Sequence, residues 1–211
     1  MFSATLPELS VKYVNQTEII SIDSGISDTL SFNFFYVAKE FKEKALLLII
    51  KNIMKSVENK FSEPKNMAEI LKSEEKTAKK QKVEAKLAKN QIHSNSPKII
   101  IFCATKHTLL HLSHIIGEFP HTVLYSTLDQ SCRVQNLQQF TSSKKNILIV
   151  TDLASRGIDV RDIDIAINYD LCESKTFIHR IGRVARNGKT GCVFALVCRD
   201  DVKAYADIKT F

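Results

Sequence analysis

The sequence predicts an α/β protein in which helices cover both faces of a parallel sheet. From Pro97 onward, apolar runs of strand length alternate with longer segments of helical periodicity. The run NILIV at 146–150 is continuously apolar, as strands buried on both faces are. Strands that alternate with helices usually join as parallel neighbours, so these two observations indicate one parallel sheet between two helical layers.

The elements of this sheet follow in order along the second half of the chain. Five strands are predicted, at Lys98–Phe102, Val123–Tyr125, Asn146–Val150, Ile163–Asn168 and Gly191–Val197. Helices are predicted between them: 106–116 capped by Thr105, one from Asp129 to Phe140, one entered from Ser174, and 201–211. Thr151 and Asp170 directly follow strands, so both are expected at the carboxyl edge, where parallel sheets bind ligands.

An upstream strand and helix are expected to open the same domain. The run SFNFFYV at 31–37 is typical of a strand rich in aromatic residues. Residues 41–53 form the predicted helix, with Leu47, Ile50 and Met54 at helical spacing. Its lysines are expected on the outside, namely Lys42, Lys44, Lys51 and Lys55. A short helix at 6–14 and a short strand at 18–22 are predicted before it.

Residues 56–96 interrupt the pattern with nine lysines, six glutamates and few large apolar side chains. Too little apolar surface can be buried here to offset the entropy of ordering the chain. We expect an insertion that is disordered or forms a loose, solvated helix. A solvated linker and a basic arm that grips RNA are the two interpretations of its charge.

The composition limits the class of protein. The 211 residues are 44% hydrophobic and 25% charged, as in globular domains. The net charge of +7 fits a nucleic-acid partner. The longest apolar run, at 45–50, is far too short to span a membrane, and no signal peptide is recognised. The five cysteines form no C-x-x-C pair, so buried free thiols in a reducing compartment are expected.

The segment HRIGRVAR at 179–186 holds three arginines within one predicted helix. Arg180, Arg183 and Arg186 follow at three-residue spacing, so one helix face can carry all three. Like charges at this spacing repel, so we expect the cluster to meet anions; a solvated basic helix is the alternative. Gly182 weakens a helix interior by about 1 kcal/mol, which indicates that something approaches its backbone closely.

Three blocks, SAT at 3–5, TDLASRGID at 151–159 and HRIGRVAR at 179–186, form an ordered set. In order and spacing they resemble the S-A-T, T-D-x-A-A/S-R-G-I/L-D and H-R-x-G-R-x-x-R motifs of DEAD-box RNA helicases of superfamily two. QSCR at 130–133 is similar to the family's Q-x-x-R, with Tyr125-Ser126 where the family carries H-G. The resemblance implies the C-terminal RecA-like half of such a helicase.

The resemblance also implies an ATP site between two RecA-like domains. Arg183 and Arg186 would bind ATP at its terminal phosphate and act as arginine fingers, with His179 as a further catalytic residue. Asp159 would bind the ribose of ATP. The residues implied to couple the two domains are Ser3, Thr5, His179 and Arg180.

RNA is the second partner that the resemblance implies, gripped along its backbone as a single strand or a duplex without reading of the bases. The implied contacts are Gln130, Arg133, Thr151, Arg156 and Gly157. Ser126 stands where the family's H-G pair has its glycine. If the backbone amide of that glycine contacts RNA, the amide of Ser126 can still donate, but its side chain leaves less room for RNA to approach the backbone.

The resemblance divides the chain into three parts. Residues 1–24 would be the tail of the first RecA-like domain, 25–55 and 97–211 the helicase C-terminal domain, and 56–96 the insertion.

The stretch GRVARNGKT at 182–190 has one residue too many for a P-loop and leads from a helix into a strand. Without a P-loop or a D-E-A-D block, this chain alone is expected to be inactive, and ATP and Mg²⁺ to be held mainly by the first domain.

Two further interpretations concern cellular role and metals. The stretch YSTLDQ at 125–130 and the ending YADIKTF at 205–211 resemble the nucleolar branch of the family, which implies a role in large ribosomal subunit assembly in the nucleus, with pre-ribosomal proteins as partners and no membrane. A catalytically inert RecA-like module that binds RNA or protein is the rival interpretation. His107, His111 and His114 share one helix face, expected to be exposed rather than to bind a metal.

Overall fold

The computed structural model describes residues 16–20, 30–61, 96–155, 160, 163–184 and 190–210, with 16–20 and 56–61 as backbone only. The chain divides into two compact units, 1–51 with 97–211, and 52–96. The first unit contains the sheet and is described below. Most of the predicted insertion, and the helix predicted at 6–14, lie outside the described residues.

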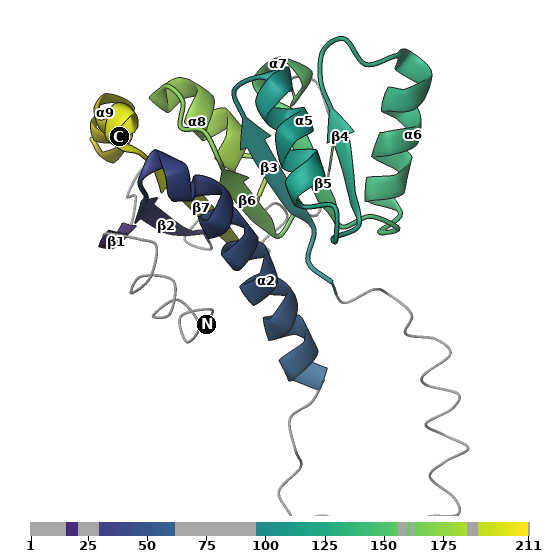
Figure 1. The fold of residues 1–211 in the computed structure, drawn as a ribbon, viewed down its shortest axis with the longest axis horizontal. Coiled ribbons are helices and arrows are strands. Elements are labelled where there is room, and N and C mark those ends of the chain that lie inside the picture. Colours follow the sequence, from purple (N-terminus) through teal and green to yellow (C-terminus); the bar gives the residue numbers. More distant parts are fainter. Residues whose placement is uncertain are drawn as a thin grey trace, which may run out of the picture. The chain divides into compact units, whose positions relative to one another are not determined.

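Seven strands form one sheet in the order β1-β2-β7-β6-β3-β5-β4 (Figure 1). Their bounds are β1 Gln16–Ile20, β2 Leu30–Tyr36, β3 Ile99–Cys103, β4 His121–Leu124, β5 Ile147–Thr151, β6 Ile165–Asn168 and β7 Gly191–Val197. Strands β2 to β7 are parallel, and β1 pairs antiparallel with β2 at the edge. The predicted α/β fold with a parallel sheet is confirmed.

Helices flank the sheet on both faces (Figure 1). Their bounds are α2 Lys42–Phe61, α5 Lys106–Ile115, α6 Gln130–Thr141, α7 Asp152–Ser155, α8 Ser174–Ile181 and α9 Val202–Lys209, with single turns at Lys39–Phe41 and Arg199–Asp201. The Thr105 hydroxyl accepts a hydrogen bond from the Thr108 amide, so the predicted cap of α5 is confirmed. Asp129 precedes α6 but makes no side-chain cap hydrogen bond.

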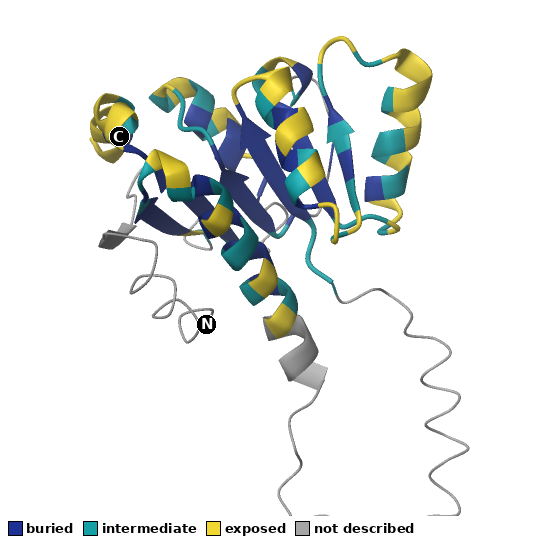
Figure 2. Cartoon of the chain, in the orientation of Figure 1, coloured by how far each residue is buried: buried dark blue, intermediate teal, exposed yellow. Residues whose placement is uncertain are grey.

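The interior strands β3 and β5 carry the predicted continuous burial (Figure 2). Every residue of β3 and β5 is buried. On one face, Phe34 of β2 stacks near Phe177 of α8, with ring centroids 6.1 Å apart, and meets Tyr205 of α9 edge-on at 5.2 Å. This apolar cluster holds α8 and α9 against the sheet. The arginine-bearing helix is thereby fixed relative to the strand ends.

Two expectations about surface residues need correction or detail. Lys42 was expected outside the helix that carries it, but the structure places it inside, 7% exposed. Among the free cysteines, Cys103, Cys192 and Cys198 are buried as expected, whereas Cys132 is exposed. In the part of the chain that the structure describes, no helix is long and apolar enough to cross a membrane.

Candidate functional site

Two of the sequence blocks meet at the carboxyl edge of the sheet. Strand β5 ends at Thr151 and continues directly into α7, whose first residue is Asp152. Strand β6 ends at Asn168, and the turn after it leads into α8, which carries His179 and Arg180. Both β5 and β6 pair with β3, so only one strand separates the two blocks.

Arg180 joins the two blocks through a two-pronged ion pair with Asp152. Its Nε and one Nη each donate to a different oxygen of the Asp152 carboxylate, both at 2.7 Å. The other Nη donates to the side-chain oxygen of Asn168 at 2.9 Å and to the backbone oxygen of Asp170 at 2.7 Å. The guanidinium lies 5.2 Å from the centre of the Phe102 ring. A planar fork of donors is suited to this arrangement, which a lysine cannot reproduce.

The position of Arg180 corrects the expectation that the three arginines share one helix face that meets anions. Arg180 is only 2% exposed, so it faces the interior of this domain. Removing one member of a buried pair leaves a desolvated charge and typically costs about 3–5 kcal/mol. A coupling role for Arg180 toward a first domain would therefore act through Asp152 rather than by direct contact.

The end of α8 differs from the prediction of a longer helix. The helix ends at Ile181, and Gly182 is its C-cap, donating its amide to the Ile178 oxygen. A Cβ atom at Gly182 would lie 3.2 Å from that same oxygen, so the close backbone approach predicted there is made by the helix itself. His179 is exposed and Arg183, beyond the helix end, is partly exposed. Val184, the residue after Arg183, bridges to Ile163 just before the start of β6, so Arg183 is held near the beginning of that strand. Arg186 lies outside the described residues.

The predicted RNA contacts are spread along the same edge. Thr151 is largely buried at the end of β5. Gln130 is exposed at the start of α6, and Arg133, one turn later, is partly buried and donates to the backbone oxygen of Tyr125 at 3.1 Å. Arg133 therefore supports the Tyr125-Ser126 turn and keeps further N–H groups for a ligand. The structure does not describe Arg156, Gly157, Asp159, Ser3 or Thr5.

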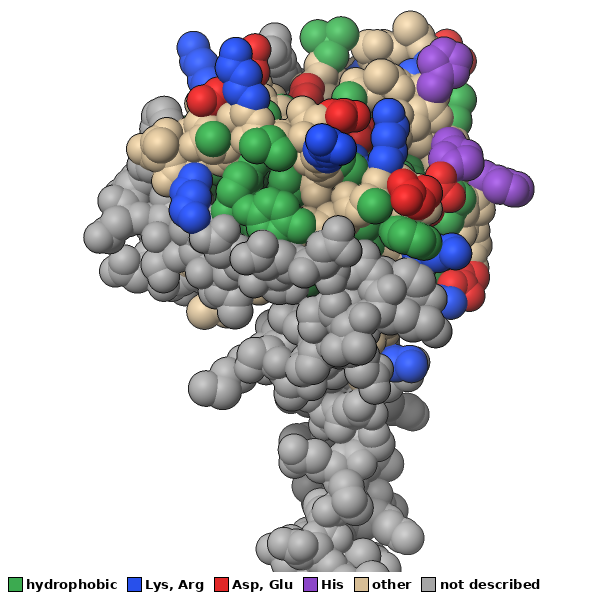
Figure 3. Space-filling view, turned by 60° about the vertical axis from the view of Figure 1, so that its left-hand side comes forward, with side chains coloured by type: hydrophobic (Ala, Val, Ile, Leu, Met, Phe, Trp, Pro, Cys, Tyr) green, Lys and Arg blue, Asp and Glu red, His purple; other side chains and the backbone are tan. Residues whose placement is uncertain are grey.

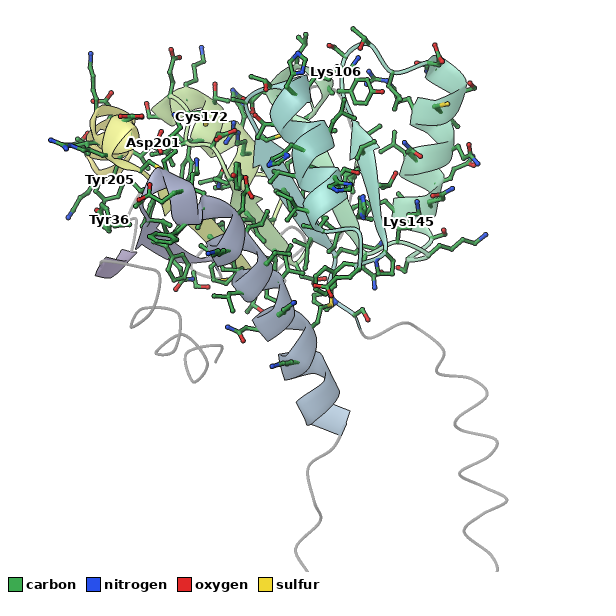
Figure 4. All side chains as sticks on the ribbon, in the orientation of Figure 1. Tyr36, Lys106, Lys145, Cys172, Asp201 and Tyr205 are labelled. Atoms are coloured by element: carbon green, nitrogen blue, oxygen red, sulfur yellow. The ribbon has the colours of Figure 1, made fainter. Side chains whose placement is uncertain are left out.

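Lys106 is a cation at this edge that sequence reasoning missed. Its ammonium group donates to the Thr127 hydroxyl at 3.1 Å and lies 4.7 Å from the centre of the Tyr125 ring. Figure 4 shows Lys106 at the edge where Cys172 also lies, and Lys145 at the opposite edge. The turn at 125–127 is thus held by one cation from α5 and one from α6. Its position directly after the Thr105 cap placed Lys106 at the start of a helix that follows a strand, and this could have predicted that it lies at the carboxyl edge.

A second missed pair, Lys42 with Asp170, lies beside Arg180. The ammonium group of Lys42 donates to one carboxylate oxygen of Asp170 at 3.0 Å, and the Ala104 amide donates to the other at 2.9 Å. Lys42 lies three residues before Ala45 and four before Leu46, both fully buried, so helical spacing places it on the buried face. This spacing predicts a buried position, but the charge of Lys42 led to the expectation of an exposed one.

Cys103 ends β3 within this polar network but is not a nucleophile. Burial raises the pKa of the Cys103 thiol to about 12, and the Asp170 and Asp152 carboxylates raise it further against the opposing effect of Arg180. Burial likewise raises the pKa of Cys172 to about 11. Both cysteines are therefore neutral thiols near pH 7.

The edge fits a phosphate-bearing ligand better than a metal ion. Arg133 and Lys106 supply cationic groups there, at the 125–127 turn. Among residues that the structure describes, no three His, Cys, Asp or Glu side chains lie together as a metal would require. On α5, His111 pairs with Glu43 at 2.8 Å; Figure 3 shows histidines exposed on the surface.

Comparison with known proteins identifies what the chain is similar to. The family described as helicase conserved C-terminal domain matches residues 78–188. The chain is 34% identical over its whole length to the ATP-dependent RNA helicase dbp10 of Schizosaccharomyces pombe, and it covers 26% of that protein. It thus spans about a quarter of the length of that relative.

Two solved structures share the fold. The E. coli DEAD-box protein SrmB, determined in complex with the regulator of ribonuclease activity A, matches with a TM-score of 0.52 and 28% identity over 59% of this chain and 75% of SrmB. S. cerevisiae Dbp5 L327V, determined with RNA and ADP BeF3, matches with a TM-score of 0.51 and 29% identity over 54% of this chain and 32% of Dbp5.

Proposed function

Because the chain belongs to the family of helicase conserved C-terminal domains, in the form found in DEAD-box RNA helicases, we propose that it is the C-terminal RecA-like half of an ATP-dependent RNA helicase. In this proposal it binds the RNA backbone and supplies arginine fingers for ATP hydrolysis. Its relatives are several times longer, so the activity belongs to a protein in which a first RecA-like domain faces this one.

The observation that carries the proposal is the ion pair between Arg180 and Asp152. It joins segment 151–159, which ends at the proposed ribose contact Asp159, to segment 179–186, which carries the proposed arginine fingers. Thr151, next to Asp152, is the proposed RNA contact. Supporting observations are the whole-chain similarity to an RNA helicase and the likeness to Dbp5, which was solved with RNA and a nucleotide.

The proposed mechanism divides the work between the two domains. The first domain holds ATP and Mg²⁺, and closure brings Arg183 and Arg186 to the terminal phosphoryl group. Water attacks that phosphorus while its bond to the ADP oxygen breaks, and the guanidinium groups stabilise the charge that develops on the phosphoryl oxygens. An arginine used in this way is worth roughly 10³–10⁵ in rate. Thr151, Arg133 and the 156–157 turn would grip single-stranded RNA by its backbone, so closure bends the strand.

Steady-state ATPase assays on this chain joined to the first domain of a relative would test the fingers. Arg183→Ala and Arg186→Ala should each remove most RNA-stimulated turnover, while ATP binding to the first domain stays nearly unchanged. Arg186→Lys should not rescue, because one ammonium group cannot replace a planar fork. Lys144→Ala is the control, since Lys144 is exposed in the turn before β5, at the opposite edge.

The outcomes separate the two functions. If both alanine variants keep near-wild-type turnover, Arg183 and Arg186 do not act in hydrolysis and belong to an ordinary basic surface. If the joined protein binds RNA but hydrolyses no ATP in any form, the inert binding module replaces the helicase half.

We further propose that the protein acts in ribosome assembly in the nucleolus. The support is the resemblance of 125–130 and 205–211 to that branch, together with the similarity to dbp10. A tagged protein expressed at its natural level should colocalise with nucleolar markers and sediment with large-subunit precursors. Uniform cytoplasmic staining would contradict this assignment and leave the helicase proposal intact.

A further inference from the structure

Lys42 is a charged residue that the fold encloses at the carboxyl edge. It is the first residue of α2 and is 7% exposed. Its ammonium group lies 3.0 Å from Asp170 and 4.6 Å from the centre of the Tyr169 ring. We infer that Lys42 and Asp170 form a positioning pair that holds the arginine helix α8 in register for catalysis. The inference rests on the proposed function, because it concerns how the proposed fingers are placed.

Asp170 is the point where three elements are tied together. Its carboxylate accepts from Lys42 of α2 and from the Ala104 amide just after β3. Its backbone oxygen accepts from Arg180 near the end of α8. Asp170 also begins the turn that leads into α8. Through this residue, both the entry to α8 and its last turn are fixed to the same point of the sheet.

The helix α8 is short, so the position of its end depends on the anchors at Asp170 and on the bridge between Val184 and Ile163. It spans Ser174–Ile181, eight residues or about 12 Å at 1.5 Å per residue. Arg183 follows two residues after the helix end. A small shift of the Asp170 turn is therefore carried to the finger with little chain in between to absorb it. Misplacement of a catalytic group by about 1 Å can cost as much as 10²-fold in rate.

A substitution can remove the ion pair between Lys42 and Asp170 while leaving the other hydrogen bonds of Asp170 in place. Lys42→Met keeps a long flexible stem beside the Tyr169 ring, and a methionine thioether packs well against an aromatic ring. Asp170→Asn keeps an oxygen for the Ala104 amide and leaves the backbone oxygen that Arg180 binds. Neither change touches Arg183 or the residues proposed to contact RNA. Both leave the Arg180–Asp152 pair complete.

The test uses this chain joined to the first domain of a relative and separates kcat from KM for ATP. Lys42→Met and Asp170→Asn should each lower kcat by about tenfold or more, with KM changed less than about twofold. Lys42→Arg keeps the charge and should recover much of the rate. Lys44→Met is the matched control, two residues along the same helix on its exposed side, and should match the parent protein.

A purely structural pair would behave differently. It would lower the melting temperature but leave kcat per folded molecule unchanged well below that temperature, and this outcome would overturn the inference. Because the pair acts as a unit, Lys42→Met with Asp170→Asn should cost little more than either change alone; full additivity would also count against it. If Lys42→Met fails to fold, Asp170→Asn alone decides.

Arg183→Ala, measured beside these variants, distinguishes the two levels. If it keeps turnover, the proposed function fails and the positioning pair has nothing to position. If it loses turnover while Lys42→Met and Asp170→Asn keep theirs, the fingers stand and only the inference about the pair is overturned.

Discussion

At the scale of single residues, Arg180 determines how the two motif blocks are held together. Four hydrogen bonds reach acceptors on Asp152, Asn168 and the backbone of Asp170, and the Phe102 ring covers it. A guanidinium with this many acceptors is stable inside a protein, because the cost of leaving water is offset by charge-assisted bonds. The geometry requires the planar fork of an arginine.

Arg180→Lys should therefore destabilise the domain. One ammonium group cannot reach all three partners, so the Asp152 carboxylate would lose at least one of its two bonds in a partly buried site. We expect a loss of about 3 kcal/mol or more in the free energy of unfolding. Urea unfolding of the 211-residue chain, followed by circular dichroism, measures it, with Lys144→Ala as the control. A change below about 1 kcal/mol would show that the pair is not the structural link described above.

The buried thiol of Cys103 gives a pH dependence with a definite sign. Burial raises its pKa in the folded state to about 12, above the value of about 9 that an exposed cysteine has. The folded state therefore keeps a proton that the unfolded state releases, so the free energy of unfolding falls as pH rises from about 9 toward 12. Cys103→Ala should make this decline shallower by about 1 kcal/mol per pH unit. Urea unfolding at pH 8, 9 and 10 measures the slopes, and equal slopes for both proteins would contradict the burial of this thiol.

At the scale of elements, the strands were predictable and the helix ends were not. Continuous apolar runs identified β3, β5 and β7 because burial on both faces leaves no other composition possible. The end of α8 was missed because Gly182 was interpreted as a mid-helix residue, whereas the chain uses it as a C-cap. Lys42 was misplaced because its charge outweighed its spacing. The first error concerns a local cap made by the helix's own carbonyls, and the second concerns a tertiary partner, Asp170, that draws a charged side chain inside.

The turn at 125–127, with α5 and α6 on either side, carries a prediction about RNA. Arg133 supports this turn through the Tyr125 carbonyl and faces the proposed RNA path. Arg133→Ala should weaken binding of all single-stranded sequences alike and flatten the slope of log affinity against log salt by about 1 unit. Fluorescence anisotropy with several labelled oligonucleotides measures both. Loss that depends on sequence would indicate base reading, and an unchanged slope would remove Arg133 from the interface.

At the scale of the whole molecule, the sheet places the proposed RNA contacts that the structure describes, Thr151, Gln130 and Arg133, at its carboxyl edge. The ends of β5 and β6 and the starts of α5, α6 and α8 all lie there. The sequence predicted this arrangement because Thr151 and Asp170 directly follow predicted strands of a parallel sheet. It did not predict that Arg180 would be buried or that Lys42 would pair with Asp170, because the pattern of residues does not specify side-chain partners.

The most direct test of the central claim compares RNA-stimulated ATP turnover in three proteins. They are this chain alone, the first RecA-like domain of a relative alone, and the two joined in one polypeptide. We expect no turnover above background from either part and clear turnover from the joined protein, abolished by Arg186→Ala. Turnover by the 211-residue chain alone, or a joined protein that stays inactive while both parts are folded and bind their ligands, would contradict the account.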